Sequence, residues 1–398
     1  MSSNPVEEMR VLVFNVGSSS LTFKVYRHAE VLVAGKCHRL GVKSSEASYL
    51  ESAYDGATTR LEVPLPDHLT ALQHVLELLA RNGVNFDAVG HRFADGGGHF
   101  DTGAVVDANT RPILERCAPL APMHNVAALR MVDLIAERFP AARQYVVFDS
   151  TFHAGLPEVA RAYALPTAMS LQYRKHGFHG LSYADVLEKA TWYLGESHYK
   201  AVFLHLGTGG SSACAIVDGH SVDTSMGFSP LQGLVMNTRC GDIDPGVILD
   251  LVTRGYSADD LTRVLHRQSG LFGLSGEVSS DIRDLLKQKE TNRNVELAIE
   301  LYVYRIRQYV GAYAAIMNGL DVLVFTDDVG LRVPEIRSAV CKNMDFLGIA
   351  LDEARNQDAQ PDRIEAINAD DSRVRVLSVP NDEERAIYAE GMILLAAG

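Results

Sequence analysis

The chain contains 398 residues, which is too long for one hydrophobic core and predicts two domains. A formal net charge of −13 excludes a broad electrostatic attraction to nucleic acid or to an anionic membrane surface. The 5 cysteines are scattered and lack C-x-x-C spacing, which favours reduced thiols in a cytoplasmic protein over disulfides or a zinc site. The N-terminal segment is polar and acidic, and no apolar run approaches the length of a membrane span. We therefore expect neither a signal peptide nor a membrane anchor.

One arrangement, in which two strands flank a turn of small residues, occurs twice in the chain. The first copy occupies Val11–Tyr26 with its turn at Gly17–Ser20, and the second occupies Ala201–Val217 with its turn at Gly207–Ser211. Turns of glycine and serine expose backbone N–H groups, which can bind phosphate oxygens. A single copy would predict no more than an ordinary hairpin, whereas two copies favour a duplicated fold that binds phosphate.

Apolar residues recur with helical spacing in several segments, most of which stop at a glycine or a proline. The predicted helices are His68–Arg81, Asn125–Phe139, Ser182–Leu194, Val295–Met317 and Asp382–Ala397. Strands and helices alternate without a low-complexity linker, which predicts an α/β protein. Because the second hairpin begins after Phe152, we place a domain boundary near that residue.

Two segments in the first half of the chain combine charge with an unusual backbone. Gly90–Gly98 places Arg92 beside a glycine cluster, which we expect to form a loop where a guanidinium could bind carboxylate or phosphate. Glycine-rich loops are common, so this signal is weak when taken alone. Val146–Ser150 is an apolar strand that ends at Asp149, a usual position for an acid that binds Mg²⁺. A turn or helix-capping role for Asp149 is an equally good interpretation.

The second half contains a denser group of charged and glycine residues. His179 lies between glycines, which suggests a close approach to a ligand, although a lone histidine is more often structural. Residues 223–245 combine Arg239 with Asp242 and Asp244 in a stretch that matches neither a strand nor an amphipathic helix. An arginine there could stabilise the charge on a phosphoryl group in transfer. A third apolar strand, Val322–Thr326, leads into a predicted turn that begins with two aspartates.

Nine motifs occur in the order found in acetate kinases, and the chain resembles that family from about Val11 to Glu384. They are NVGSSSL, GHR, APLAPMHN, FDSTFH, YALP, GFHG, HLGTGGSS, DTSMGFSPLQGLVMNTRCGDIDP and VPNDEE. The resemblance implies two domains of the ASKHA type (sugar kinase, actin and Hsp70), with a ribonuclease H-like fold and a cleft between them. The first domain would comprise residues 1–152 and 383–398, and the second residues 153–382. It also implies a homodimer, dependence on Mg²⁺ (or Mn²⁺), and direct in-line transfer between acetate and a phosphate donor.

The resemblance assigns expected roles residue by residue. Arg92, Asp149, His179 and Arg239 would be catalytic: the arginines would flank the carboxylate and the moving phosphoryl group, and the histidine would stabilise the transition state. The metal would be held by Asn15, Asp149 and Glu383, with Glu384 as a close alternative to Glu383. Donor phosphates would be bound by Asn15, Ser18, Ser20, Thr22, His205, Gly207, Thr208, Gly209, Gly210 and Ser211. The seat for the acetate methyl group would be formed by Phe93, Met123, His124, Phe178 and Pro230.

Several positions depart from the pattern of the resembling family. Where ATP-using members read FTGGIGEN, this chain reads FTDDVGLR, so that Asp327 and Asp328 replace two glycines that would leave room for adenosine. A desolvated carboxylate beside an anionic ligand costs several kcal/mol unless it is paired. Thr22 and Thr208 also depart from the common motifs, and Asp95 replaces the histidine that usually follows the GHR arginine. These replacements resemble the branch in which pyrophosphate and orthophosphate substitute for ATP and ADP.

The leading hypothesis is therefore acetyl phosphate plus phosphate in equilibrium with acetate plus pyrophosphate, with no nucleic acid or membrane partner. An ATP-dependent acetate or propionate kinase is the first alternative. A catalytically weak homologue that binds phosphometabolites is the second, and Asp95 is the feature that favours it.

Overall fold

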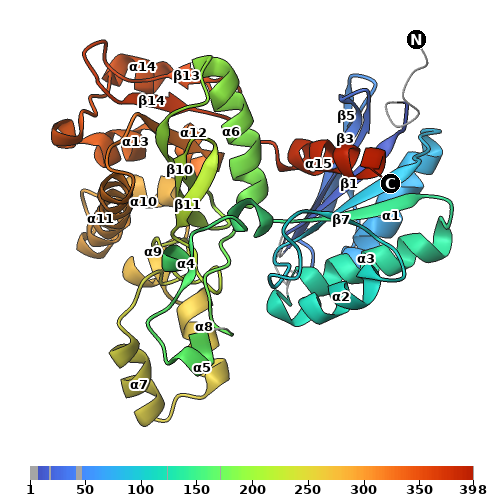
Figure 1. Cartoon of the computed structure of the whole chain (residues 1–398), viewed down its shortest axis with the longest axis horizontal. Helices are drawn as coiled ribbons and strands as arrows, with labels where there is room; N and C mark the ends of the chain where they lie inside the picture. Colours follow the sequence, from blue (N-terminus) through green and yellow to red (C-terminus); the bar gives the residue numbers. More distant parts are fainter. Residues whose placement is uncertain (1–7, 18, 42–46, 123, 171, 398) are drawn as a thin grey trace. The chain divides into compact units, whose positions relative to one another are not determined.

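The computed structural model of the chain describes residues 8–17, 19–41, 47–122, 124–170 and 172–397, and it divides into two compact units. Unit 1 contains Met1–Ala154 and Asp382–Gly398, and unit 2 contains Gly155–Asn381. Unit 2 is therefore inserted into the sequence of unit 1 (Figure 1). Within the described residues, no helix combines the length and the apolar character needed to cross a membrane.

Unit 1 is built on a mixed sheet with the strand order β5-β4-β3-β2-β1-β6-β8-β7. The strands are β1 (Val11–Val16), β2 (Ser20–Arg27), β3 (Glu30–His38), β4 (Tyr49–Tyr54), β5 (Ala57–Glu62), β6 (Ala88–Phe93), β7 (Ala104–Val105) and β8 (Arg143–Phe148). The helical elements are α1 (His68–Arg81), α2 (Thr110–Cys117), η1 (Ala118–Leu120), α3 (Asn125–Arg138), η2 (Thr151–His153) and α15 (Glu383–Ala397). β1, β6 and β8 run parallel, so their carboxyl ends meet at one edge of the sheet.

Helices cover both faces of this sheet. Phe14 of β1 and Val146 of β8 lie in one core with Leu72 of α1 and Met131 of α3. Because successive side chains of a strand point to opposite faces, Tyr145 faces the other side of the sheet. There α15 packs against β1 and β8, and Gly391 lies so close to the Tyr145 ring that any Cβ atom at this position would clash with it.

Unit 2 repeats the arrangement with the strand order β11-β10-β9-β12-β14-β13. Its strands are β9 (Lys200–Leu206), β10 (Ser211–Val217), β11 (His220–Thr224), β12 (Val322–Thr326), β13 (Glu365–Ala366) and β14 (Arg375–Ser378). Its helical elements are α4 (Glu158–Arg161), α5 (Thr167–Ser170), α6 (Gly180–Leu194), α7 (Pro245–Thr253), α8 (Ala258–Arg267), α9 (Gly270–Leu274), α10 (Ile282–Leu286), α11 (Arg293–Ile316), α12 (Asp327–Arg332), α13 (Pro334–Cys341), η3 (Asp345–Leu347) and α14 (Glu353–Asp358). In both units, an antiparallel meander precedes parallel strands: β3-β2-β1 with β6 and β8, and β11-β10-β9 with β12 and β14.

The duplicated hairpins that the sequence predicts are confirmed. β1 pairs antiparallel with β2, and β9 pairs antiparallel with β10. Each turn contains an equivalent backbone hydrogen bond, from Gly17 N to Ser20 O (2.9 Å) in the first and from Gly207 N to Gly210 O (3.0 Å) in the second. The predicted helix His68–Arg81 is also confirmed, since α1 has the same bounds.

Two local predictions are wrong. Arg92 was expected on a glycine-rich loop, but Gly90 and Arg92 lie on the buried strand β6. Gly90 is needed there because a Cβ atom would clash with Tyr145 of the neighbouring strand β8. The turn expected after Thr326 is instead the short helix α12, which starts at Asp327. Acidic residues in a first helical turn interact favourably with the helix dipole, and this effect favours a helix over a turn.

His91 of β6 gives unit 1 a pH-dependent stability. Its ring contacts Gln144 (2.8 Å), and burial lowers its pKa from 6.5 to about 4, a shift that the hydrogen bond opposes. The unfolded chain therefore binds a proton as the pH falls through 6.5, while the folded chain does not bind it until about pH 4. We expect the free energy of unfolding to fall by about 3 kcal/mol between these two pH values because of His91 alone.

Urea unfolding at pH 7, 5.5 and 4.5 would measure this loss, and His91→Gln should reduce it. His220→Gln, at the exposed start of β11, is the matched control and should keep the wild-type pH dependence. Equal pH slopes for wild type and His91→Gln would show that His91 does not carry the effect.

Candidate active site

Predicted site residues of unit 1 gather at the carboxyl ends of the parallel strands. Asn15 lies near the carboxyl end of β1, Arg92 lies near the carboxyl end of β6, and Asp149 directly follows β8. Arg92 forms a fork on Asp149, from Nε to Oδ1 (3.1 Å) and from Nη2 to Oδ2 (2.5 Å). Its Nη1 donates to Asn15 Oδ1 (3.1 Å) and to the Val16 carbonyl (3.0 Å). The guanidinium is therefore held rigidly by partners from two neighbouring strands.

The start of α15 adds acidic groups to this cluster. Asn15 Nδ2 donates to Glu383 (2.8 Å) and to Glu384 (2.9 Å). Lys24 of β2 pairs with Asp382 (2.6 Å) and approaches Glu384 (3.4 Å). Glu384 is thus buried and paired with a lysine, whereas Glu383 is only partly buried.

The charges of this cluster shift one another's titration. Burial opposes the charge of Arg92, but Asp149, Glu383 and Glu384 outweigh it and raise the pKa of the guanidinium. Burial also raises the pKa of Glu384, helped by the nearby Glu383 and Asp382, while Lys24 and the Asn15 amide oppose the shift. Removing either partner of the Arg92–Asp149 pair would leave a desolvated charge, since the Asp149 side chain is only 2% exposed.

The donor chemistry of Asn15, Asp149 and Glu383 fits Mg²⁺. All three offer oxygen atoms, and Mg²⁺ is usually bound through one or two carboxylates, several waters and substrate phosphates. Within the described part of the chain, no group of three or more His, Cys, Asp or Glu side chains is arranged to bind a metal by itself. The residues therefore fit an ion that keeps waters and shares the substrate's phosphates.

In unit 2, two predicted catalytic residues converge on the turn between β9 and β10. A Cβ atom on Gly210 would lie 3.3 Å from Arg239 Nη1 and 3.6 Å from His179 Nε2. Thr208 and Gly209 are exposed at the tip of this turn, and Ser211 is buried with its hydroxyl near Tyr302 (3.3 Å). A guanidinium and an imidazole nitrogen thus flank a turn of the type that binds phosphate.

Arg239 is partly buried without a compensating anion. Its Nη1 contacts the Pro230 carbonyl (3.1 Å) and the Met236 sulfur (3.7 Å). No ion pair joins Arg239 to a carboxylate among the described residues, and burial lowers its pKa. A desolvated cation without an anionic partner is costly, so this position favours an anionic ligand.

Histidines and an aspartate surround the same turn. His179 has a left-handed backbone (φ 61°) just before α6, and its ring stacks on that of His205 at 4.0 Å. His205 Nε2 lies 3.0 Å from Asp327 Oδ2. A Cβ atom on Gly207 would clash with the same Asp327 carboxylate, so this side chain faces the turn.

Asp328 differs from Asp327 in its surroundings. Its carboxylate pairs with Arg283 (3.3 Å) and with Arg332 (3.2 Å). From the sequence, both aspartates are expected to obstruct adenosine. In unit 2, Asp327 is directed at the glycine turn, whereas Asp328 is directed at the two arginines.

The residues predicted to seat the acetate methyl group occupy different surroundings. Phe93 is fully buried in the unit 1 core and packs edge-on against Phe148. Phe178 forms a small apolar cluster with Met226 and Met236, next to Arg239. His124 directly precedes α3, and Pro230 offers its carbonyl to Arg239. Met123, like the predicted phosphate ligand Ser18, lies outside the described residues.

The remaining predicted positions lie on or near the first hairpin. Ser20 and Thr22 are partly buried on β2, and Thr22 is opposite Asn15 in the β1–β2 register. Asp95 is buried, and its side chain accepts a hydrogen bond from Gly97 N (2.8 Å), which holds the glycine-rich turn. Asp95 thus has a structural role within unit 1.

Sequence reasoning missed several supporting residues, among them Ser212, Tyr183 and Ser182, which contact the site histidines. Ser212 contacts His179 Nδ1 (2.8 Å) and Tyr183 (2.5 Å), and Ser182 contacts His205 Nδ1 (2.9 Å). One available signal is that Tyr183 lies one helical turn after His179.

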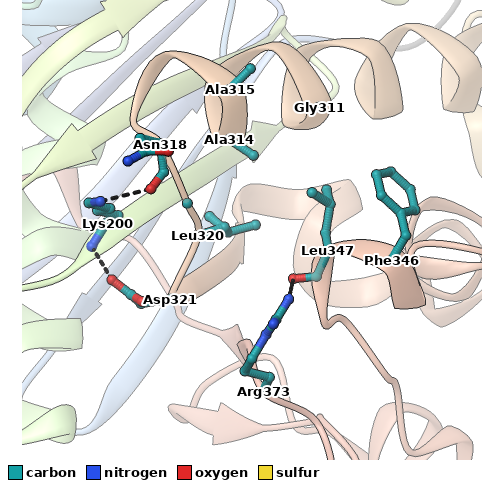
Figure 2. A pocket seen from close by; sticks show the side chains of 11 residues that line it. Lys200, Gly311, Ala314, Ala315, Asn318, Leu320, Asp321, Phe346, Leu347 and Arg373 are labelled. Carbon is teal, nitrogen blue, oxygen red and sulfur yellow. Dashed lines mark hydrogen bonds between the residues drawn. The ribbon is translucent and has the colours of Figure 1, made fainter.

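A cavity in unit 2 lies away from these residues. It has a volume of about 590 Å³ and is lined by Lys200, Asn318, Leu320, Asp321, Phe346, Arg373 and small residues of α11 (Figure 2). Lys200 starts β9 and Asp321 precedes β12, so the cavity lies at the amino ends of these strands, opposite the glycine turn. It contains none of the predicted site residues.

The sequence and the structure were compared with known proteins. The sequence pattern described as the Acetokinase family matches residues 10–389. An acetate kinase from Dictyoglomus turgidum is 40% identical over 397 residues, which cover 96% of this chain and 96% of the relative. The crystal structure of acetate kinase from Entamoeba histolytica matches with a TM-score of 0.89 and 40% identity, covering 97% of this chain and 99% of that chain. The crystal structure of a propionate kinase from Francisella tularensis matches with a TM-score of 0.88 and 30% identity, covering 96% of this chain and 98% of that chain.

The repeated sheet and its match to these solved kinases define a two-domain α/β phosphotransferase of the ASKHA type, which confirms the predicted fold class. Within this class, acetate kinases use a carboxyl group as the acceptor. The chain belongs to the acetokinase family, and the resemblance seen in its motifs is thereby confirmed.

Proposed function

We propose that the chain transfers a phosphoryl group reversibly between acetate and a phosphate donor through an in-line reaction. The observation that carries this proposal is the Arg239 guanidinium, which lacks a carboxylate partner among the described residues and adjoins His179 at the glycine turn. A phosphoryl group in transfer spreads negative charge over its equatorial oxygens, and fixed donors stabilise that charge. Arg239 and His179 Nε2 are such donors, and the backbone amides of the turn bind the donor phosphates.

In this proposal, the unit 1 cluster supplies a second fixed guanidinium and the metal ligands. Asp149 and Asn15 hold Arg92 so that its charge binds an anionic substrate group without reorganisation. Mg²⁺ would be held through Asn15, Asp149 and Glu383, with water, and would neutralise phosphate charge when bound. Phe178 and its methionine neighbours, next to Arg239, support an apolar seat for the acyl group in unit 2.

Two donor pairs are candidates, and a different observation favours each. ATP and ADP are favoured by the comparisons, in which the relatives carry the name acetate kinase and nothing marks a pyrophosphate branch. Pyrophosphate and orthophosphate are favoured by Asp327, whose carboxylate faces the glycine turn and would repel the added charge of a nucleotide. We take ATP and ADP as the first candidate and pyrophosphate as the second.

One assay separates these candidates. The purified chain with Mg²⁺ and acetyl phosphate is supplied in parallel with ADP and with orthophosphate, and ATP and pyrophosphate are measured directly. Efficient ATP formation supports the first donor, and efficient pyrophosphate formation supports the second. Loss of acetyl phosphate no faster than uncatalysed hydrolysis in both arms would overturn the proposed transfer and leave a weak, ligand-binding homologue. A parallel reaction with propionyl phosphate tests whether the enzyme accepts a longer acyl chain.

The metal assignment gives a separate prediction. Asp149→Asn and Glu383→Gln should each raise the Mg²⁺ concentration needed for half-maximal activity by about 10-fold, because each weakens a carboxylate near the ion. Glu390→Gln is the matched control, since this acid lies on the same helix α15 but accepts a hydrogen bond from Gly103. Magnesium titrations that coincide with the wild-type curve for both variants would contradict the assignment.

We also propose that the chain forms a homodimer through α7. No residue of this helix is buried, and Val247, Leu249 and Val252 are exposed apolar side chains. Leu249 and Val252 are three positions apart and share one face of α7, and exposed apolar side chains on one face favour an interface. Separately, the five free thiols fit a cytoplasmic protein. Sedimentation should show a dimer that Leu249→Asp with Val252→Asp dissociates, whereas Ile393→Asp, at an exposed position of α15, should not. A monomeric wild type would overturn this proposal.

A further inference from the structure

The two ring nitrogens of His179 have different surroundings within unit 2. Nε2 lies on the side of Gly210 and of Arg239 Nη1. Nδ1 lies 2.8 Å from the Ser212 hydroxyl, which in turn lies 2.5 Å from the Tyr183 hydroxyl. Two hydroxyl groups in series thus stand behind the nitrogen that faces away from the phosphate turn.

Regular elements fix this series in place. Ser212 is fully buried on β10, and Tyr183 is fully buried on α6, one turn beyond His179. The Tyr183 amide donates to the His179 carbonyl (3.0 Å), so the helix starts with the histidine in its left-handed conformation. The neighbours that bring charge to the ring are Arg239 beside Nε2 and the His205–Asp327 pair beneath the stacked face.

A proton on Nε2, facing the proposed phosphoryl anion, leaves Nδ1 as an acceptor for Ser212 and Ser212 Oγ as an acceptor for Tyr183. Burial raises the pKa of this phenol well above its ordinary value, so the hydroxyl keeps its proton. The neutral phenol can therefore donate its proton to Ser212 Oγ. Ser212 then donates its single proton to His179 Nδ1.

We propose that Ser212 and Tyr183 are positioning residues that hold His179 as the Nε2–H tautomer, with that N–H directed to the phosphoryl group beside Arg239. The proposal rests on the proposed role of His179 in phosphoryl transfer. The opposite tautomer would turn a lone pair toward an anion, which repels it. Arg239 then supplies the positive charge, and the neutral imidazole supplies an oriented donor.

The test combines the tautomer with the kinetics. The ¹⁵N shifts of the His179 ring in histidine-labelled protein, assigned by difference from His179→Gln, report which nitrogen carries the proton. We expect Nε2–H in the wild type and a mixture of tautomers in Ser212→Ala, with kcat about 10-fold lower and KM changed by less than about 2-fold. Ser212→Thr keeps the hydroxyl and should restore most of kcat. Tyr183→Phe preserves the ring volume, so it remains testable if Ser212→Ala does not fold.

Two matched controls remove buried hydroxyls that contact other partners in unit 2. Ser221→Ala removes a hydroxyl near Cys214 (3.3 Å), and Tyr199→Phe removes one that contacts Thr191 (2.8 Å). Both should keep the wild-type tautomer and kcat. An unchanged tautomer and kcat in Ser212→Ala, together with a lowered kcat in His179→Gln, would overturn only the positioning role of Ser212 and Tyr183. A wild-type kcat in His179→Gln would instead overturn the proposed role of His179.

Discussion

Arg239→Ala is expected to lower kcat by about 10²–10³-fold while leaving the free energy of unfolding unchanged or slightly higher. The rate loss follows from removing one fixed charge beside His179 at the phosphate turn. Stability should not suffer, because burial lowers the pKa of Arg239 and no carboxylate among the described residues loses a partner. Steady-state kinetics with acetyl phosphate and urea unfolding measure the two effects. Arg263→Ala, at an exposed pair on α8, is the control.

Arg92→Ala should show a different combination of effects, although the sequence gives no reason to separate the two arginines. Its rate loss should be similar, but it also removes the arginine partner of the Asp149 carboxylate, whose side chain is only 2% exposed. Breaking a buried pair in this way typically costs about 3–5 kcal/mol of stability. Arg92→Ala with Asp149→Asn should therefore recover stability without recovering rate. A wild-type kcat in either single variant would remove that arginine from the proposed site.

Asp327→Gly is expected to raise the affinity for ADP and ATP by about 10-fold or more, which corresponds to about 1.4 kcal/mol. The variant removes the carboxylate that faces the glycine turn. It should also fold normally, because Asp327 has a left-handed backbone (φ 63°) that glycine adopts without strain. Nucleotide binding is measured by calorimetry with ADP and magnesium.

Asp328→Gly is the matched control for this prediction. It removes the same charge one residue further on, where the carboxylate pairs with Arg283 and Arg332. We expect a much smaller change in nucleotide affinity than for Asp327→Gly. If both variants bind ADP as the wild type does, the obstruction hypothesis is wrong and nucleotide affinity does not depend on these two carboxylates. Fast ATP turnover is a separate matter, because Thr22 and Thr208 also differ from the common motifs.

Local patterns in the sequence predicted the fold well where one short-range rule dominated. Strand periodicity and a glycine turn located both hairpins, and helical spacing located α1. The failures have tertiary causes. Gly90 belongs to a strand because Tyr145 of a neighbouring strand occupies the space of its side chain, and no local pattern contains that information.

For the candidate site, the sequence proposes residue types but not how the residues pair. Asn15 contacts Glu383 from 368 positions away, and the sequence predicts Glu383 as a metal residue with Glu384 as a close alternative. Only the structure separates them, because Lys24 is directed at Glu384. Supporting hydroxyls such as Ser212 carry no motif of their own, since a serine in a strand has many roles.

The insertion of unit 2 into unit 1 has a consequence for biosynthesis. The ribosome delivers β1 to β8 first, then all of unit 2, and α15 last. The sheet face that bears Tyr145 and Tyr26 is covered by this last helix, where Tyr26 stacks on Tyr388 at 4.6 Å. Domains usually fold as they emerge, starting from the N-terminus. In this protein, the unit whose synthesis begins first is completed after the other, and its aromatic face stays open in the nascent chain until α15 has been made.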